Sequence, residues 1–331
     1  MFLPAGQRAQ GRKRDGWRRG AAGAVLVLTA ALAWWALIAG EPSSGPAPSP
    51  VEIPDAGGRA EGTAALNPTP ASNADVPAAT PWRVHAVEYA RSRAIPRARL
   101  VRGGGRGGRV DMSWYFFVAR RADRVVLIDC GTNALSHPGS DLRSRWSIAD
   151  AVPVTEALGR LDLAPEDVTD VVLTHHHWDH VGALGLFETA RVHVHPAEWR
   201  SVSRSLRAPV EDSGRLRLLG DSAQNEQNEP LEGLILPGLG AYEAGHHTAH
   251  QLMVTVACEG GAIILAGDAA YLYQNIEGGL PVTATRDATQ NVADVSAAVR
   301  GVGAGRVIPG HDPEVFLRYP SADPRVAAIC P

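Results

Sequence analysis

Short runs of apolar, β-branched or aromatic residues recur after residue 82 and predict β-strands. Two longer segments, 148–161 and 287–302, carry apolar residues at helical spacing, and residues 259–261 predict a tight hairpin turn. The early part is rich in strands and the later part alternates, which favours an α/β fold with helices packed outside two β-sheets. The strand-like runs are residues 84–89, 114–118, 125–129, 171–174, 191–195, 234–236, 252–258, 262–266 and 306–308.

The first 40 residues have the pattern of a targeting segment. Six basic residues and one acid precede an uncharged apolar run, residues 21–40. This run is long enough to cross a bilayer, so we predict a signal anchor or transmembrane segment with its basic side in the cytoplasm. The remainder would then be periplasmic or at the cell surface. The alternatives are a cleaved signal peptide, which would give a secreted protein, and a twin-arginine export signal at Arg18 and Arg19.

Composition divides the rest of the chain into two parts. Residues 41–81 are rich in Pro, Ala and Gly and have few large apolar side chains, so we predict a disordered linker. Residues 82–331, roughly 250 residues, suit one α/β domain. Within it, the polar segment 201–230 predicts a loop or short-helix excursion near a site.

Charge and cysteine content exclude some functions. The formal net charge is −3 and no basic patch stands out, so nucleic acid is not an expected partner. Cys130, Cys258 and Cys330 are an odd, widely spaced set without a CxxC motif. We therefore expect neither a disulfide framework nor a thiolate metal site.

The strongest chemical pattern is the sequence HHHWDH at residues 175–180, directly after a strand-like run. At the end of a strand, residues two apart point to the same side, so His175 and His177 can share one metal ion. Asp179 and His180 on the following turn can reach a second ion. His176 alternates to the other side and is not expected to be a ligand. Imidazole and carboxylate are the donors of catalytic zinc sites.

This segment resembles the H-x-H-x-D-H motif of the metallo-β-lactamase superfamily, which implies a four-layer αβ/βα sandwich. The resemblance covers about residues 84–311. It implies two Zn²⁺ ions, the first held by His175, His177 and His246 and the second by Asp179, His180 and His311, with Asp268 as the bridge. Iron is an alternative metal, because the same donors suit it. Asp129 is expected to orient a ligating imidazole.

The segment that carries the next expected histidine ligand, residues 245–250, departs from the usual family pattern. The family reads G-H-T-P-G-H, whereas this chain has GHHTAH from Gly245. The spacing to His250 matches only if His246 is the ligand, so we prefer His246 over His247.

Asp268 and Tyr271 resemble the N-acyl homoserine lactonase branch of the family, where a tyrosine three residues after the bridging aspartate faces the substrate. This likeness implies a lactonase that opens N-acyl homoserine or related lactones by attack of a metal-bridging hydroxide. Tyr271 would stabilise the oxyanion, and Asp179 would pass a proton to the departing alkoxide. Tyr273 is expected to serve packing.

Two other functions fit the same residues. A thioester or other ester hydrolase could use the same metal site, and a zinc-binding module could keep the ligands without turnover. The expected partners are a small lactone or ester substrate and, through the N-terminal segment, a membrane. Neither the acyl-chain preference nor the oligomeric state follows from the residues.

Overall fold

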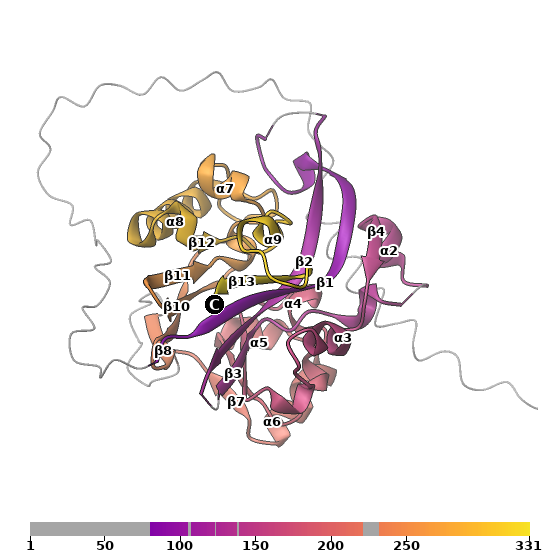
Figure 1. Ribbon diagram of the computed structural model, residues 1–331, viewed down its shortest axis with the longest axis vertical. Coiled ribbons are helices and arrows are strands. Elements are labelled where there is room, and N and C mark those ends of the chain that lie inside the picture. The colour runs from indigo at the N-terminus through magenta and orange to yellow at the C-terminus, as the bar shows by residue number, and fades with distance from the viewer. Residues whose placement is uncertain (1–79, 105–106, 123, 138, 221–231) are drawn as a thin grey trace, which may run out of the picture. The chain divides into compact units, whose positions relative to one another are not determined.

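Strands from distant parts of the chain build the first of two β-sheets. The computed structural model describes residues 80–104, 107–122, 124–137, 139–220 and 232–331 (Figure 1). The strands of the first sheet are β1 (Arg83–Pro96), β2 (Arg109–Arg121), β3 (Arg124–Ile128), β4 (Ile148–Ala151), β5 (Asp170–Leu173), β6 (Arg191–Val194), β7 (Leu216–Leu218) and β13 (Val326–Cys330). Their order is β13-β1-β2-β3-β5-β6-β7, with β4 paired to β1. β3, β5, β6 and β7 run parallel.

The second sheet has the order β12-β11-β10-β9-β8. Its strands are β8 (Glu232–Leu236), β9 (Leu239–Glu243), β10 (Leu252–Cys258), β11 (Gly261–Leu265) and β12 (Val307–Ile308). The pairs β8 with β9, β9 with β10 and β10 with β11 are antiparallel, whereas β11 and β12 are parallel. One apolar cluster contains residues of both sheets, among them Val126 and Ile128 of β3 and Val254 of β10. This cluster is the core between the sheets.

Helices cover the outer faces of the sheets (Figure 1). The helices are α2 (Asp141–Arg145), α3 (Val154–Gly159), α4 (Trp178–Val181), α5 (Pro196–Ser201), α6 (Arg204–Asp212), α7 (Tyr273–Glu277), α8 (Ala288–Val302) and α9 (Val315–Arg318). Helix α8 packs on β11 and β12, and α3 packs on β1. In β5, Val172 joins the core between the sheets while Val171 and Leu173 join a second apolar cluster. This alternation is the period of a strand buried on both faces.

Each of the nine strand-like runs lies in or overlaps a strand of the structure, and α8 confirms the helical prediction for residues 287–302. The hairpin turn at residues 259–261 is confirmed too, since β10 and β11 pair up to Cys258 and Gly261. The prediction of one helix over 148–161 is wrong. Residues Ile148–Ala151 form strand β4, and α3 begins only after Pro153, which lacks the N–H that a continuous helix needs.

The polar segment 201–230 contains more regular structure than expected. Helix α6 and strand β7 occupy its first part, and residues 221–231 lie outside the described residues. The predicted membrane span, residues 21–40, lies outside them as well, and so does the predicted linker up to residue 79. Among the residues that the structure describes, no helix is both long and apolar enough to cross a membrane.

The cysteines were not expected to form a disulfide framework, but two of them form one disulfide. Cys258 at the end of β10 and Cys330 at the end of β13 are bonded, although they are 72 positions apart in sequence, and their Cα atoms are 6.0 Å apart. Strand β13 pairs with β1, and Trp82 just before β1 donates its backbone N–H to Ala257 next to Cys258. Tertiary pairing thus joins two cysteines that are remote in sequence, and the bond ties one sheet to the other.

Candidate metal centre

Chemically reactive residues gather where parallel strands of both sheets end. Asp129 follows β3 and Thr174 follows β5, while Asp268 and His311 each come three residues after the end of β11 and β12. Because parallel strands end at the same edge of a sheet, each pair of side chains lies close together. A hydrogen bond from Leu252 N–H to the carbonyl of Thr174, 2.9 Å long, joins the end of β5 to the second sheet.

The segment after β5 keeps an extended backbone up to the start of α4. His177 has φ −65° and ψ 151°, so side chains still alternate here. His175 is fully buried, whereas the side chain of His176 is 19% exposed and points to Glu198 instead of the centre. The structure therefore places His176 outside the cluster, as the alternation predicts.

The segment before β10 turns differently, and it corrects the preference for His246. Gly245 and His246 both have positive φ, +97° and +53°. A Cβ atom on Gly245 would lie 2.3 Å from the Cβ of Ala269, so only glycine fits there. The left-handed backbone turns His246 outward, where its side chain is 40% exposed and 3.5 Å from Asp294. His247 faces the centre in its place.

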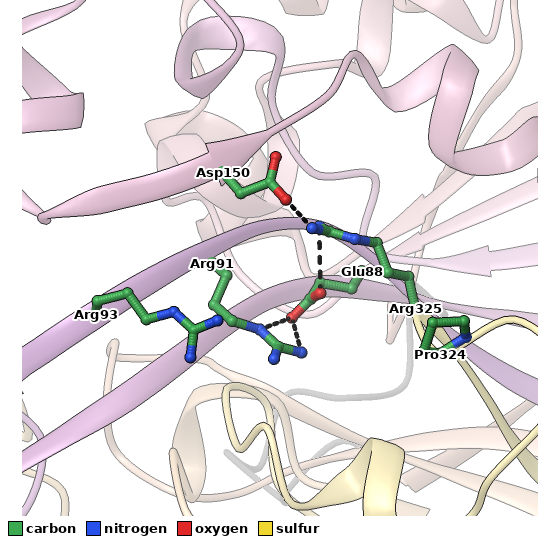
Figure 2. Close-up of a pocket in the computed structure, with 6 residues that line it drawn as sticks. All are labelled: Glu88, Arg91, Arg93, Asp150, Pro324 and Arg325. Atoms are coloured by element: carbon green, nitrogen blue, oxygen red, sulfur yellow. Dashed lines mark hydrogen bonds and ion pairs between the residues drawn. The ribbon is translucent and has the colours of Figure 1, made fainter.

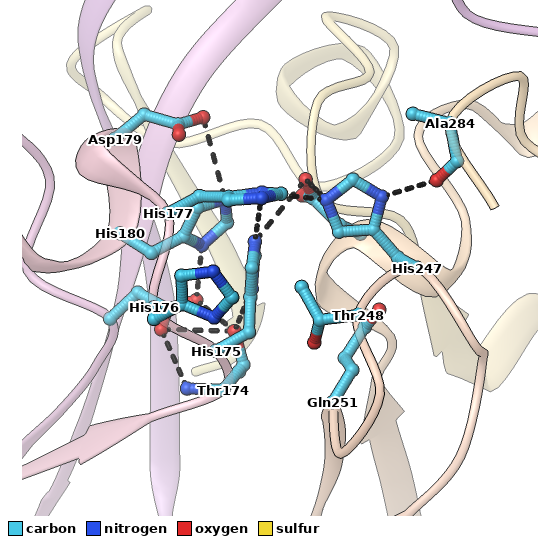
Figure 3. Close-up of polar contacts among 12 residues, drawn as sticks. Thr174, His175, His176, His177, Asp179, His180, His247, Thr248, Gln251 and Ala284 are labelled. Carbon is cyan, nitrogen blue, oxygen red and sulfur yellow. Dashed lines mark hydrogen bonds and ion pairs between the residues drawn. The ribbon is translucent and has the colours of Figure 1, made fainter. Parts of the chain in front are cut away.

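The first candidate ligand group consists of His175, His177 and His247, which Figure 3 labels, together with Asp268. His177 Nδ1 lies 3.0 Å from His175 Nε2 and 2.8 Å from His247 Nε2. Asp268 Oδ2 lies 3.2 Å from His247 Nε2 and 3.7 Å from His175 Nε2. Three ring nitrogens and one carboxylate oxygen thus surround one point.

The second group consists of Asp179, His180 and His311. Asp179 Oδ2 lies 3.4 Å from His180 Nε2 and 3.8 Å from His311 Nε2. The other carboxylate oxygen of Asp268, Oδ1, lies 3.2 Å from His180 Nε2 and 3.0 Å from His311 Nε2. Asp268 therefore presents one oxygen to each group, which is the arrangement of a bridging carboxylate.

Outer hydrogen bonds hold the rings in place. Asp129 Oδ2 is 2.8 Å from His180 Nδ1, and Asp129 also accepts the hydroxyl of Thr174, so the expectation that it orients an imidazole is confirmed. His311 Nδ1 lies 3.0 Å from the carbonyl of Ser113, and His247 Nδ1 lies 2.5 Å from that of Ala284. Carbonyl and carboxylate oxygens accept only, so in these rings Nδ1 carries the proton. A neutral ring then presents the bare lone pair of Nε2 to the centre.

The arrangement fits metal ions better than hydrogen bonds. His177 Nδ1 faces two other ring nitrogens, and one proton at most cannot satisfy all three. His180 Nε2 is buried and finds no hydrogen-bond partner among the described residues. A buried polar atom without a partner is costly, and a cation in reach of these lone pairs would remove that cost. The residues therefore fit two metal ions.

Burial also favours the ligand form of several groups. It lowers the pKa of His175 well below the usual value, aided by the nearby His180 and His177, and it lowers the pKa of His177 to about 3. The pKa of His247 is lowered by burial as well. Burial alone would raise the pKa of Asp268, but the charges of His180, His311 and His247 lower it well below its ordinary range. Neutral His175, His177 and His247 beside the ionised Asp268 match what a metal ion requires. At His180, burial alone would lower the pKa, but the charges of Asp268, Asp129 and Asp179 raise it well above the usual value, so a metal ion would have to displace a proton there.

Tyr271 borders the first group from the segment after Asp268. Its hydroxyl lies 3.3 Å from His247 Nδ1, and its ring centre is 5.6 Å from that of His311. Burial, followed by the charges of Asp268 and Asp179, raises the pKa of Tyr271, so the hydroxyl keeps its proton. Tyr273 points elsewhere and packs beneath Arg318, whose guanidinium carbon is 3.5 Å from its ring centre.

A third group of ligand-type side chains, His195, Glu243 and His250, escaped the sequence analysis. Glu243 accepts a hydrogen bond of 2.9 Å from His250 Nδ1, and its other oxygen lies 3.8 Å from His195 Nε2. His195 Nδ1 accepts the N–H of Ala197 at the start of α5. The proton of the neutral ring is then on Nε2, which leaves no lone pair there for a metal.

A cavity of about 230 Å³ lies beside β1 and β4 (Figure 2). Arg91 pairs with Glu88 at 2.7 Å, Arg325 pairs with Asp150 and lies 3.3 Å from Glu88, and Arg93 pairs with Asp111 at 2.5 Å. Each guanidinium that lines this cavity is thus neutralised by a carboxylate, and the cavity carries no part of the metal centre.

Comparison with known proteins gives one consistent result. Residues 108–311 match the family model described as metallo-beta-lactamase superfamily. The N-acyl homoserine lactonase AttM of Azorhizobium caulinodans is 25% identical over 240 residues, which cover 66% of this chain and 89% of the relative.

Two solved structures share the fold. A mutant of B. thuringiensis AiiA with N-decanoyl-L-homoserine bound at the active site superposes with a TM-score of 0.55, at 17% identity over 70% of this chain and 94% of the other. AidC, described as a dizinc quorum-quenching lactonase, superposes with a TM-score of 0.52, at 12% identity over 70% of this chain and 87% of the other.

Proposed function

Because the chain belongs to the metallo-beta-lactamase superfamily, we propose that this metal-dependent hydrolase is a two-zinc lactonase that opens N-acyl homoserine lactones or related lactones. One observation carries the proposal. The two candidate ligand groups share Asp268, and the hydroxyl of Tyr271 lies beside them. Relatives named N-acyl homoserine lactonase, matched over most of their length, support the substrate class. The expected four-layer αβ/βα arrangement belongs to the same proposal.

The proposed ligands are those that the structure brings together. His175, His177 and His247 would hold the first zinc ion and Asp179, His180 and His311 the second, with Asp268 shared. The donor set of imidazoles and carboxylates supports zinc, as does the dizinc description of AidC. Such ions, when bound, polarise an acyl carbonyl and lower the pKa of water.

Protein groups would complete the reaction. The Tyr271 hydroxyl would donate a hydrogen bond to the carbonyl oxygen as negative charge develops on it. Asp179 would carry a proton to the alkoxide that leaves when the ring opens. Trp178 is only partly buried and its ring centre lies 5.5 Å from that of the buried Trp114, so its ring would suit the apolar part of an acylated substrate.

We also propose that the domain works outside the cytoplasm. The Cys258–Cys330 bond supports an oxidising compartment, because such bonds are rare in the reducing cytosol. The apolar run at residues 21–40 supports anchoring there through a membrane segment.

The test is turnover of short- and long-chain N-acyl homoserine lactones by the purified full-length protein with two equivalents of zinc, beside a thioester and a β-lactam. We expect lactone opening that a chelator abolishes and zinc restores. Cleavage of the thioester without lactone opening would move the function to an ester hydrolase on the same centre. Zinc binding without turnover of any substrate would identify a non-catalytic module.

A further inference from the structure

Glu198 is a buried carboxylate for which the reaction has no direct use. It lies in the short helix α5 (Pro196–Ser201), and the residue as a whole is 2% exposed. Burying an ionised carboxylate costs free energy unless donors surround it. The contacts of Glu198 show which donors offset this cost.

Its two oxygens serve two different segments. Oε2 accepts the backbone N–H of His176 at 3.2 Å and a closer hydrogen bond from His176 Nδ1. Oε1 accepts the hydroxyl of Thr248 at 2.8 Å and the backbone N–H of His250 at 3.0 Å. Burial alone would raise the pKa of Glu198, but the hydrogen bonds from these three residues lower it to about 2, so the carboxylate is ionised.

We propose that Glu198 is a positioning residue that sets the spacing between the two histidine segments of the proposed zinc centre. His176 lies between the ligands His175 and His177, and Thr248 directly follows the ligand His247. The carboxylate thus clamps both segments one residue from the nitrogens that must converge. The short distance between the two segments at the centre, 2.8 Å from His177 Nδ1 to His247 Nε2, is consistent with this clamp (Figure 3).

The clamp requires a carboxylate at this position. All four groups that face Glu198 are donors, and an ionised carboxylate accepts on both oxygens. A glutamine of the same shape would turn its NH₂ toward one pair of donors. It would lose the bonds to one segment and keep those to the other, so the spacing would no longer be held.

This inference rests on the proposed zinc centre, and the experiment keeps the two apart. Zinc dissociation constants are measured by chelator competition on the full-length wild type and on Glu198→Gln. The matched control is Glu243→Gln, which removes a carboxylate that bonds His250 but touches neither His176 nor Thr248. We expect Glu198→Gln to weaken zinc binding about 10–100-fold, as for other groups that orient ligands, and Glu243→Gln to match the wild type.

A second variant breaks the same clamp while Glu198 stays. Thr248→Val removes only the hydroxyl donor, so we expect zinc binding to weaken in the same direction by a smaller factor. If Glu198→Gln lowers the melting temperature of the metal-free protein but leaves its zinc affinity equal to that of Glu243→Gln, the residue is merely structural and the proposal is wrong. If Glu198→Gln does not fold, unchanged zinc affinity in Thr248→Val overturns it. Absence of tight zinc binding in the wild type would instead refute the zinc centre itself.

Discussion

The two histidine segments, residues 174–180 and 245–250, bring candidate ligands to one centre through different backbone conformations. The first continues strand β5 in an extended conformation, so every second side chain faces the centre. The second passes through two residues of positive φ, Gly245 and His246, and this turn shifts the inward position by one residue. Alternation along the sequence is therefore a reliable guide only as long as the backbone stays extended.

The largest expected effect is in the extended segment. His177→Ala removes the nitrogen that faces both His175 and His247, so it should lose metal and nearly all hydrolytic activity. His176→Ala should keep most of both at saturating zinc, because its side chain is not a ligand and its backbone N–H still bonds Glu198. Loss of its Nδ1 donor to Glu198 should only weaken zinc binding by a small factor, as expected for Thr248→Val. Both histidine variants are compared with the wild type by their metal content, from atomic absorption, and by their kcat/KM. Full zinc occupancy in both variants would contradict the ligand assignment.

The segment 245–250 allows a second comparison of an inward-facing with an outward-facing histidine, here His247 with His246. His247→Ala should lose the first metal ion and most of the activity, whereas His246→Ala should retain wild-type metal content, because its ring is 40% exposed and points toward Asp294. Zinc stoichiometry of the two purified variants decides between them. The opposite result would restore the assignment that spacing alone favoured.

A smaller effect is expected for Tyr271→Phe. The hydroxyl lies beside His247 but is not a ligand, so zinc content should be unchanged while kcat falls by about 100-fold, as for the loss of one oxyanion donor. Steady-state kinetics on a lactone at saturating zinc provide the measurement. Unchanged kcat would make Tyr271 a packing residue.

The smallest expected effect concerns the turn itself. Gly245→Ala adds a methyl group that would meet Ala269 and also strains a residue at φ +97°, so we expect a loss of about 1–3 kcal/mol in unfolding free energy. Gly279→Ala is the control, because φ is +58° there but nothing lies within 4 Å. Urea unfolding of the metal-free proteins compares them. Equal losses would mean that backbone strain alone restricts Gly245.

Local patterns predicted much of this molecule because they reflect contacts between near neighbours. The apolar run before His175 predicts a buried strand, and strand β5 is indeed buried on both faces. The helix predicted for residues 148–161 was wrong. Pairing of β4 with β1 and the proline at position 153 determine the structure there, despite the helical spacing of the apolar residues. Strands β4, β7, β9 and β13 escaped prediction, since short strands depend on the partner beside them more than on their own residues.

The sequence by itself indicated the family, through its histidine and aspartate motif, and the strand ends that carry Asp268 and His311. It also indicated which side chains of the extended segment face the centre, because a strand has a fixed period of two. Only the tertiary structure decided that His247 takes the place of His246, that Cys258 meets Cys330, and that Glu198 lies between the two segments. Each of these depends on a backbone turn or on packing between residues remote in sequence. Such contacts are decided by the shape and hydrogen-bonding groups of the partner, which the spacing of residues along the chain does not record.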